Sequence, residues 1–190
     1  MKTLKSICII LLFITTISQS QITKGNWMVG GTGSFSYSKT ENLNNTPSSG
    51  TTINYNSIGT YTVALEPNVG YFLINKLAIG CKLNYINGFS EGEKLDSNGM
   101  NLSFGPYIRY YFLKEDKMYN LFIEPSYNRF LSNGLGNASS FAIKSGFVIF
   151  MNSSVGFETS ISYSKSTSSK FERNDVFLGF GLQIYLENDK

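Results

Sequence analysis

The chain has 190 residues, of which 42% are hydrophobic, 15% are aromatic and only 15% are charged. This length suits one ordinary domain, and the charged fraction lies below the roughly 25% of soluble domains. Histidine is absent from the sequence. Its absence excludes nucleophiles activated by histidine, histidine-ligated metals and imidazole acid-base chemistry.

Residues 1–20 have the pattern of a secretory signal peptide. Two lysines precede an apolar stretch over 7–17, and small serines precede an expected cut ahead of Gln21. The stretch is too short to cross about 30 Å of hydrocarbon, which takes roughly 20 apolar residues. We therefore expect export of the chain and one mature domain over 21–190.

The mature chain is close to electrical neutrality. Loss of the two leader lysines leaves 14 basic residues against 13 acidic ones, a net charge of +1. No basic surplus remains to indicate a nucleic-acid partner. Cys8 leaves with the leader, so Cys81 stands alone and an intrachain disulfide is not expected. No residue pattern points to a cofactor or a metal, and we expect neither.

From residue 26 onward, apolar and polar residues alternate with a period of two, which is typical of β-strands. The alternation predicts eight strands, each long enough to cross an outer-membrane apolar band at a tilt, at 26–39, 58–74, 77–89, 99–113, 119–131, 139–151, 154–165 and 174–186. The sequence therefore predicts an all-β fold, an eight-stranded antiparallel up-and-down transmembrane β-barrel.

The connections between these strands differ in length. Short turns are expected at Asn75-Lys76, 114–118 and 152–153, whereas the longer polar connections lie at 40–57, 90–98, 132–138 and 166–173. Short periplasmic turns and longer extracellular loops are typical of outer-membrane barrels. With an even number of strands, both termini are expected on the periplasmic side.

Three prolines interrupt the predicted strands: Pro67, Pro106 and Pro125. Proline removes a hydrogen-bond donor from the ladder and is normally confined to edges or bulges. We therefore expect bulges or bends at these three positions.

Each strand has one apolar face and one face of mostly Gly, Ser, Thr and Asn. Parity leaves two orientations open, because a soluble lipocalin-like carrier of lipids or small molecules would turn the apolar face inward. A membrane barrel turns that face outward to lipid. Low charge on the polar face, small residues suited to a narrow lumen and aromatics near the strand ends favour the membrane orientation.

The polar face carries one charge on each of six successive strands, and three of these charges are acidic and three basic: Glu66, Lys82, Arg109, Glu124, Lys144 and Glu158. Interspersed charges can neutralise one another in a narrow lumen, where isolated charges are costly. We interpret the set as a structural ion-pair ladder, with an ion pathway as the alternative. On this interpretation, replacing Glu124 by alanine should destabilise the fold by roughly 1–4 kcal/mol.

The leader, the first strand GNWMVGGTGSFSYS, the EP-containing strands and the final DVFLGFGLQIYL together resemble the outer membrane protein beta-barrel domain family, which includes small OmpA- and OmpX-type barrels. The resemblance spans the mature chain and implies residence in a Gram-negative outer membrane. It also implies an assembly signal for the barrel-insertion machinery at Gly181, Ile184 and Leu186. The charged tail 187–190 departs from the aromatic end that is common in this family.

The residues do not favour an enzyme. Barrel enzymes similar in size to this chain generally rely on histidine, and the three luminal glutamates are better explained by pairing with the three luminal cations. Two non-enzymatic hypotheses remain. The first is a structural or surface-interaction barrel that contacts partners through its four longer loops, and the second is a narrow ion-conducting pore. The first is preferred because eight strands leave little open lumen.

Overall fold

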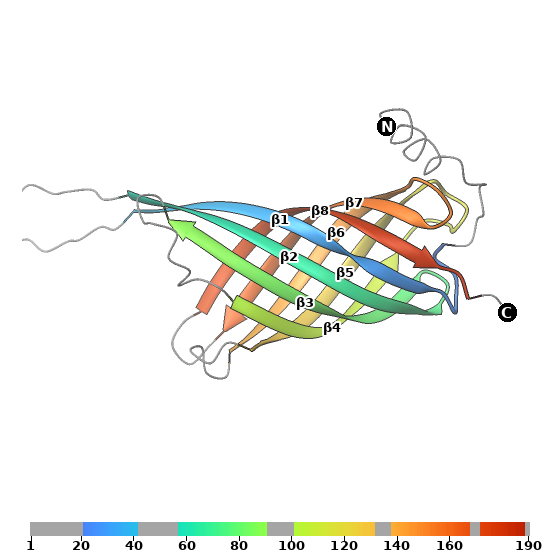
Figure 1. Cartoon of the computed structure of the whole chain (residues 1–190), viewed down its shortest axis with the longest axis horizontal. Coiled ribbons are helices and arrows are strands. Elements are labelled where there is room, and N and C mark those ends of the chain that lie inside the picture. The colour runs from blue at the N-terminus through green and yellow to red at the C-terminus, as the bar shows by residue number, and fades with distance from the viewer. Residues whose placement is uncertain (1–20, 42–56, 91–100, 132–137, 168–171, 189–190) are drawn as a thin grey trace, which may run out of the picture.

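A computed structural model describes residues 21–41, 57–90, 101–131, 138–167 and 172–188. Eight antiparallel strands close into one barrel in chain order (Figure 1). They are β1 (Trp27–Glu41), β2 (Ser57–Ile74), β3 (Leu77–Ser90), β4 (Asn101–Tyr111), β5 (Tyr119–Phe130), β6 (Ser139–Phe150), β7 (Val155–Thr167) and β8 (Glu172–Leu186). The predicted fold class and the eight predicted strands are confirmed, with ends that differ by a few residues. Among the described residues, no helix has the length and apolar character needed to cross a membrane.

The barrel closes where β1 pairs with β8, from Trp27 opposite Leu186 to Phe35 opposite Leu178. The short connections β2–β3, β4–β5 and β6–β7 all lie at one end of the barrel (Figure 1). The two ends of the described chain meet there as well, because the backbone N–H of Asn188 donates to Oδ1 of Asn26 at 3.4 Å. We call this the short-turn end, and it corresponds to the predicted periplasmic side.

An asparagine lies in each of two short turns. Lys76, which follows Asn75, has a positive φ of 68° and completes the tight turn between β2 and β3. Between β6 and β7, Oδ1 of Asn152 accepts hydrogen bonds from the backbone N–H groups of Ser154 and Val155, both at 2.8 Å. Asparagine favours the second of these turns, because its short side chain bonds to nearby backbone groups. In the first turn, Oδ1 of Asn75 accepts instead from the backbone N–H of Lys24 at 2.9 Å.

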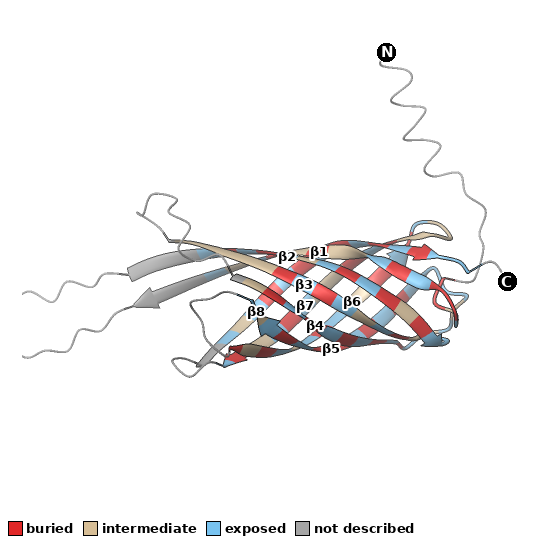
Figure 2. Ribbon diagram, turned by 60° about the horizontal axis from the view of Figure 1, so that its bottom comes forward, coloured by how far each residue is buried: buried red, intermediate tan, exposed pale blue. Residues whose placement is uncertain are grey.

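The two faces of the strands are oriented as predicted. Residues alternate between buried and exposed along the strands (Figure 2). The exposed face carries the large apolar side chains, from Trp27 in β1 to Leu186 in β8, and the polar side chains point into the lumen. This arrangement is that of a membrane barrel. It is the reverse of a lipocalin-like carrier, whose apolar side chains would line the interior.

The expectation of bulges at the three prolines is wrong. Strand register is the same before and after each proline. The register shift that the structure does show lies between Phe72 and Ile74, beside the β2–β3 turn. No bulge forms at the prolines. Instead, residue pairing with one of the two neighbouring strands is interrupted beside each proline.

A strand residue directs its N–H and its C=O toward the same neighbour, so a missing N–H weakens only one of its two ladders. Pro67 is paired with Gly31 in β1, and Pro106 is paired with Cys81 in β3. Pro125 is paired with Ile143 in β6. Each proline thus keeps a complete ladder on one side, which explains why it is tolerated without a bulge.

Candidate functional site

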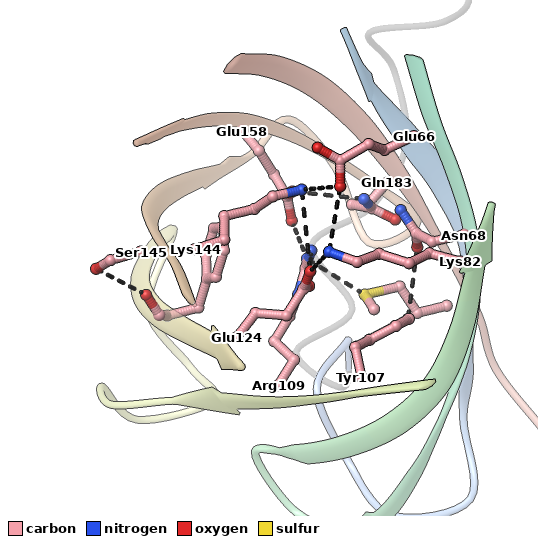
Figure 3. A network of polar contacts seen from close by, with 12 residues as sticks. Glu66, Asn68, Lys82, Tyr107, Arg109, Glu124, Lys144, Ser145, Glu158 and Gln183 are labelled. Carbon is pink, nitrogen blue, oxygen red and sulfur yellow. Dashed lines mark hydrogen bonds and ion pairs between the residues drawn. The ribbon is translucent and has the colours of Figure 1, made fainter. Parts of the chain in front are cut away.

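The six luminal charges meet near the middle of the barrel and form one continuous network (Figure 3). Glu124 lies at its centre. One of its carboxylate oxygens accepts from Nε of Arg109 at 2.6 Å, and the other accepts from Nζ of Lys82 at 3.0 Å. Nζ of Lys144 lies 3.9 Å from Glu124. A single carboxylate therefore has three cations around it.

The network extends from Glu124 in two directions. On one side, Arg109 is ion-paired with Glu158. On the other side, one carboxylate oxygen of Glu66 accepts from Lys82 at 3.2 Å and from Lys144 at 3.0 Å. All six charges are thus paired, and the three acids balance the three bases. Because isolated charges are costly in a narrow lumen, this pairing stabilises the closed interior.

Arg109 joins the charge network to the short-turn half of the lumen. Its side chain is fully buried, and its guanidinium lies 4.4 Å from the centroid of the Phe122 ring. It also donates to the Tyr111 hydroxyl at 3.3 Å, and that hydroxyl lies 3.0 Å from the hydroxyl of Tyr185. A planar guanidinium suits this position, because it can pair with carboxylates at its edge while its face stacks on a ring.

Below the charges, the short-turn half of the lumen is packed with apolar and aromatic side chains. Phe72 is fully buried, and the centroid of its ring lies 6.0 Å from that of Tyr111 and 6.3 Å from that of Tyr185. The Phe150 and Tyr185 rings meet edge to face at 5.4 Å. We call this set the aromatic layer; its buried cluster comprises Ile22, Met28, Phe72, Ala78, Tyr107, Tyr111, Phe122, Val148, Phe150 and Tyr185.

Glycines make room for one ring of this layer. Gly70 and Gly80 face each other across β2 and β3, and a side-chain carbon on either would lie 2.5–2.7 Å from the Tyr107 hydroxyl. The Tyr107 side chain therefore lies flat over a bare stretch of barrel wall. Its hydroxyl reaches Oδ1 of Asn68 at 3.5 Å. Larger residues at these two glycines would force the ring out of the lumen.

The segment 21–26 closes the short-turn end beneath the aromatic layer. Ile22 is fully buried in the aromatic layer, and its carbonyl accepts from the backbone N–H of Lys76 at 2.8 Å. The backbone N–H of Gly25 donates to the Phe72 carbonyl at 2.9 Å, and the N–H of Phe72 donates to the Asn26 carbonyl at 3.0 Å. The segment is thus bonded to the end of β2 and its turn, with one isoleucine inserted in the mouth.

The opposite half of the lumen is looser and polar. A cavity of about 50 Å³ lies above the charge network, with Glu66, Lys82 and Lys144 at its base. Serine and asparagine side chains line its wall, including Asn128, whose Oδ1 is buried without a hydrogen-bond partner. We call this cavity the polar cup. Its size and its polar atoms suit a few water molecules.

Sequence reasoning identified the six charges but missed the aromatic layer and the role of segment 21–26. The layer belongs to the face that was interpreted as small and polar. Extending the same parity to the strand ends would have found it, because Phe72, Tyr111 and Tyr185 all lie on that face. No local sequence pattern in 21–26 predicts that Ile22 is buried.

The remaining predicted site residues are placed as follows. In the expected assembly signal, Ile184 and Leu186 point outward and Gly181 is buried against β1. The expected leader 1–20 lies outside the described residues, as do most residues of the four longer loops. Within the described part of the chain, no three acidic, cysteine or histidine side chains are grouped to hold a metal ion.

The solved structures that are similar to this barrel include two outer-membrane proteins. The Neisserial surface protein A (NspA) matches with a TM-score of 0.56 and 14% identity, over 85% of this chain and 99% of that chain. The outer membrane protein OprG from Pseudomonas aeruginosa matches with a TM-score of 0.50 and 13% identity, over 91% of this chain and 100% of that chain. No family model and no curated protein matches the chain.

These likenesses concern the fold. The chain is an eight-stranded barrel of the outer-membrane type, so the resemblance to small outer-membrane barrels is confirmed at the level of fold. The fold and its apolar exterior support the predicted outer-membrane location and contact with membrane lipid.

Proposed function

We propose that this protein is a non-enzymatic outer-membrane barrel that acts as a structural or surface-interaction protein and does not conduct ions. Its four longer connections, 40–57, 90–98, 132–138 and 166–173, would meet partners outside the cell. The barrel would then serve as a rigid base that holds these connections at the membrane surface.

The observation that carries this proposal is the double closure of the lumen. The charge network blocks the middle of the barrel, with Arg109 fully buried and Glu124 and Glu158 each 1% exposed. The aromatic layer and Ile22 block the short-turn end. An ion would have to break the network and displace packed rings in turn, and the desolvation cost at each step opposes its passage.

The final strand would direct assembly. Ile184 and Leu186 present an apolar edge of β8 to the membrane, and Gly181 sits where a side-chain carbon would lie 2.6 Å from the Gly31 carbonyl. We propose that these residues are read by the barrel-insertion machinery before β8 closes against β1. The tight fit at Gly181 would favour correct closure of that seam.

The first experiment on the non-conducting barrel is a planar-bilayer recording of the folded protein, with a known porin as the positive control. We expect no discrete conductance steps. Steps that persist after further purification, and that change in size when Glu66 or Lys144 is replaced, would overturn the non-conducting part in favour of the ion pore.

The second experiment tests the surface role. Each longer connection is replaced by a short Asn-Gly turn, and folding of each variant is checked by its gel mobility with and without boiling. We expect loss of surface recognition, adhesion or envelope integrity for at least one connection. The matched control replaces 114–118 at the short-turn end. Full retention in all four variants would contradict the surface role.

A further inference from the structure

Two basic side chains project from the outer wall of the barrel near its long connections. Arg129 in β5 and Lys165 in β7 are both exposed, on the outward faces of their strands. Among the described outward side chains of the eight strands, these two are the only charged ones. Strand β6 lies between them, and the residue pairing places their Cα atoms roughly 10–12 Å apart.

The rings next to these two charges indicate the depth at which they lie. Toward the short-turn end, the next outward residue is Tyr127 in β5 and Tyr163 in β7. Phe141 in β6 is paired with Tyr127 on one side and with Lys165 on the other. All three rings are about half exposed. Because aromatic rings of an outer-membrane barrel gather at the membrane–water interface, Arg129 and Lys165 lie at the depth of the lipid headgroups.

The same wall is hollowed nearer the middle of the barrel. A depression of about 410 Å³ crosses β5–β8 and is lined mostly by apolar side chains, with the smaller Ser145 and Thr159 among them. Thr159 precedes Lys165 by six residues in β7, which is about 20 Å along a strand and about 15 Å of depth at a tilt near 40°. One leaflet of hydrocarbon is also about 15 Å thick. An acyl chain whose headgroup lies at Lys165 would therefore reach the depression.

We propose that this wall of β5–β8 binds a phosphorylated glycolipid of the outer leaflet, of the lipopolysaccharide class. Arg129 and Lys165 would bind phosphate groups of its head, and one acyl chain would lie in the depression. Arginine offers five N–H donors and lysine three, so each can bind a phosphate as well as a protein neighbour. The proposal depends on the long connections lying outside the cell, and it is independent of the role proposed for them.

The charges favour this occupant over an uncharged lipid or a second barrel. Two cations at headgroup depth are complementary to a head that carries more than one phosphate. A second copy that docked symmetrically on this wall would bring the same two basic residues together, and like charges repel. The described outward side chains of β1–β4 include no charge, so the attraction to an anionic head is specific to this wall.

Native mass spectrometry of the folded protein in neutral detergent micelles tests the proposal, with bisphosphorylated lipid A as the probe and phosphatidylglycerol as the competing lipid. We expect the barrel to retain lipid A in preference. The double variant Arg129→Gln with Lys165→Gln should bind lipid A about thirtyfold more weakly, because each basic residue near an anionic lipid contributes about a factor of five. The matched control, Lys114→Gln with Lys117→Gln, removes the same charge at the short-turn end and should bind normally.

A second pair of variants tests the depression, and gel mobility without boiling confirms that every variant is folded. Thr159→Phe should weaken binding of lipid A several-fold, because a ring would fill the depression without changing the charges. Its control, Cys81→Phe, adds the same ring to the outward face of β3 and should bind normally.

Three results would overturn the proposed lipid site. They are unchanged binding in the Arg129 and Lys165 double variant, an equal loss in the Lys114 and Lys117 control, and equal retention of phosphatidylglycerol and lipid A by wild type. Unchanged binding in Thr159→Phe would overturn the placement of the acyl chain. None of these results bears on conductance or on surface recognition.

Discussion

The two halves of the lumen are built from the same strands but are filled in different ways. Toward the long connections, the polar cup is lined with serine and asparagine and retains a cavity of about 50 Å³. Toward the short turns, the aromatic layer leaves Phe72, Tyr111 and Phe122 with no exposed surface. Water can therefore enter the barrel from one end only, and the charge network marks the depth at which it stops.

This difference gives each half a separate role. Close packing in the short-turn half stabilises the barrel, because removing a methylene group from a densely packed interior lowers the free energy of unfolding. The polar cup contributes less, because water can replace many of its contacts. Substitutions at matched positions in the two halves should therefore differ in cost.

The largest expected effect is that of Phe72→Ala in the aromatic layer. We expect a loss of about 3–5 kcal/mol in the free energy of unfolding, because the ring is fully buried and its neighbours cannot collapse into the space. The matched control is Phe177→Ala in the wall of the polar cup, with an expected loss below about 2 kcal/mol. Urea unfolding in detergent micelles, followed by gel mobility, measures both. Equal losses of unfolding free energy in the two variants would contradict the inferred difference in packing between the two halves of the lumen.

The second effect concerns the boundary between the two halves. Glu124→Ala should cost about 2–4 kcal/mol, because it leaves three cations with only two carboxylates. Glu66→Ala should cost less, about 1 kcal/mol, because that side chain borders the polar cup and is 12% exposed. The same urea titration compares the two. A larger loss of unfolding free energy for Glu66→Ala than for Glu124→Ala would contradict the inference that Glu124 is the more tightly held of the two.

The third effect tests the closure of the short-turn end. Ile22→Ala should cost about 1–2 kcal/mol, at or below the low end for a buried aliphatic side chain, because a terminal segment can detach without opening the barrel. The unfolding curve in urea gives this value, and bilayer recordings should still show no conductance. Conductance of this variant would mean that the charge network alone does not close the lumen.

The smallest effect is expected in the polar cup itself. Ser140→Ala should change the free energy of unfolding by less than about 0.5 kcal/mol, because the cup has room for water at the lost hydroxyl. Thermal conversion from the unboiled to the boiled gel form provides a sensitive comparison with wild type. A loss above about 1 kcal/mol would show that the cup is packed as tightly as the other half.

The sequence was sufficient to predict the strands and their faces, because a period of two is repeated along all eight strands and each strand has one distinctly apolar face. The six luminal charges could be identified for the same reason, since each stands alone on a polar face. Which charge pairs with which depends on register and on the curvature of the barrel. Lys82, for example, contacts Glu124 two strands away as well as Glu66 on the adjacent strand.

Other features could not be predicted from the pattern. Alternation places Phe72 and Tyr185 on the luminal face, but their packing against each other, with ring centroids 6.3 Å apart, depends on the closed barrel. The burial of Ile22 depends on the chain folding back across the mouth. The prolines suggested bulges. Whether a missing N–H disturbs the pairing with one neighbouring strand or the other depends on which strand that N–H would face in the closed sheet, and the sequence does not show this.

Two of those prolines lie at the same seam, and this has a consequence for how the barrel is held together. Pairing between β4 and β5 lapses near Pro106 and Pro125, while the register on either side places Arg109 directly opposite Glu124. These two side chains are joined in the charge network, where Nε of Arg109 donates to Glu124 at 2.6 Å. The ion pair therefore joins β4 to β5 from the luminal side, at the place where backbone pairing between the two strands is interrupted.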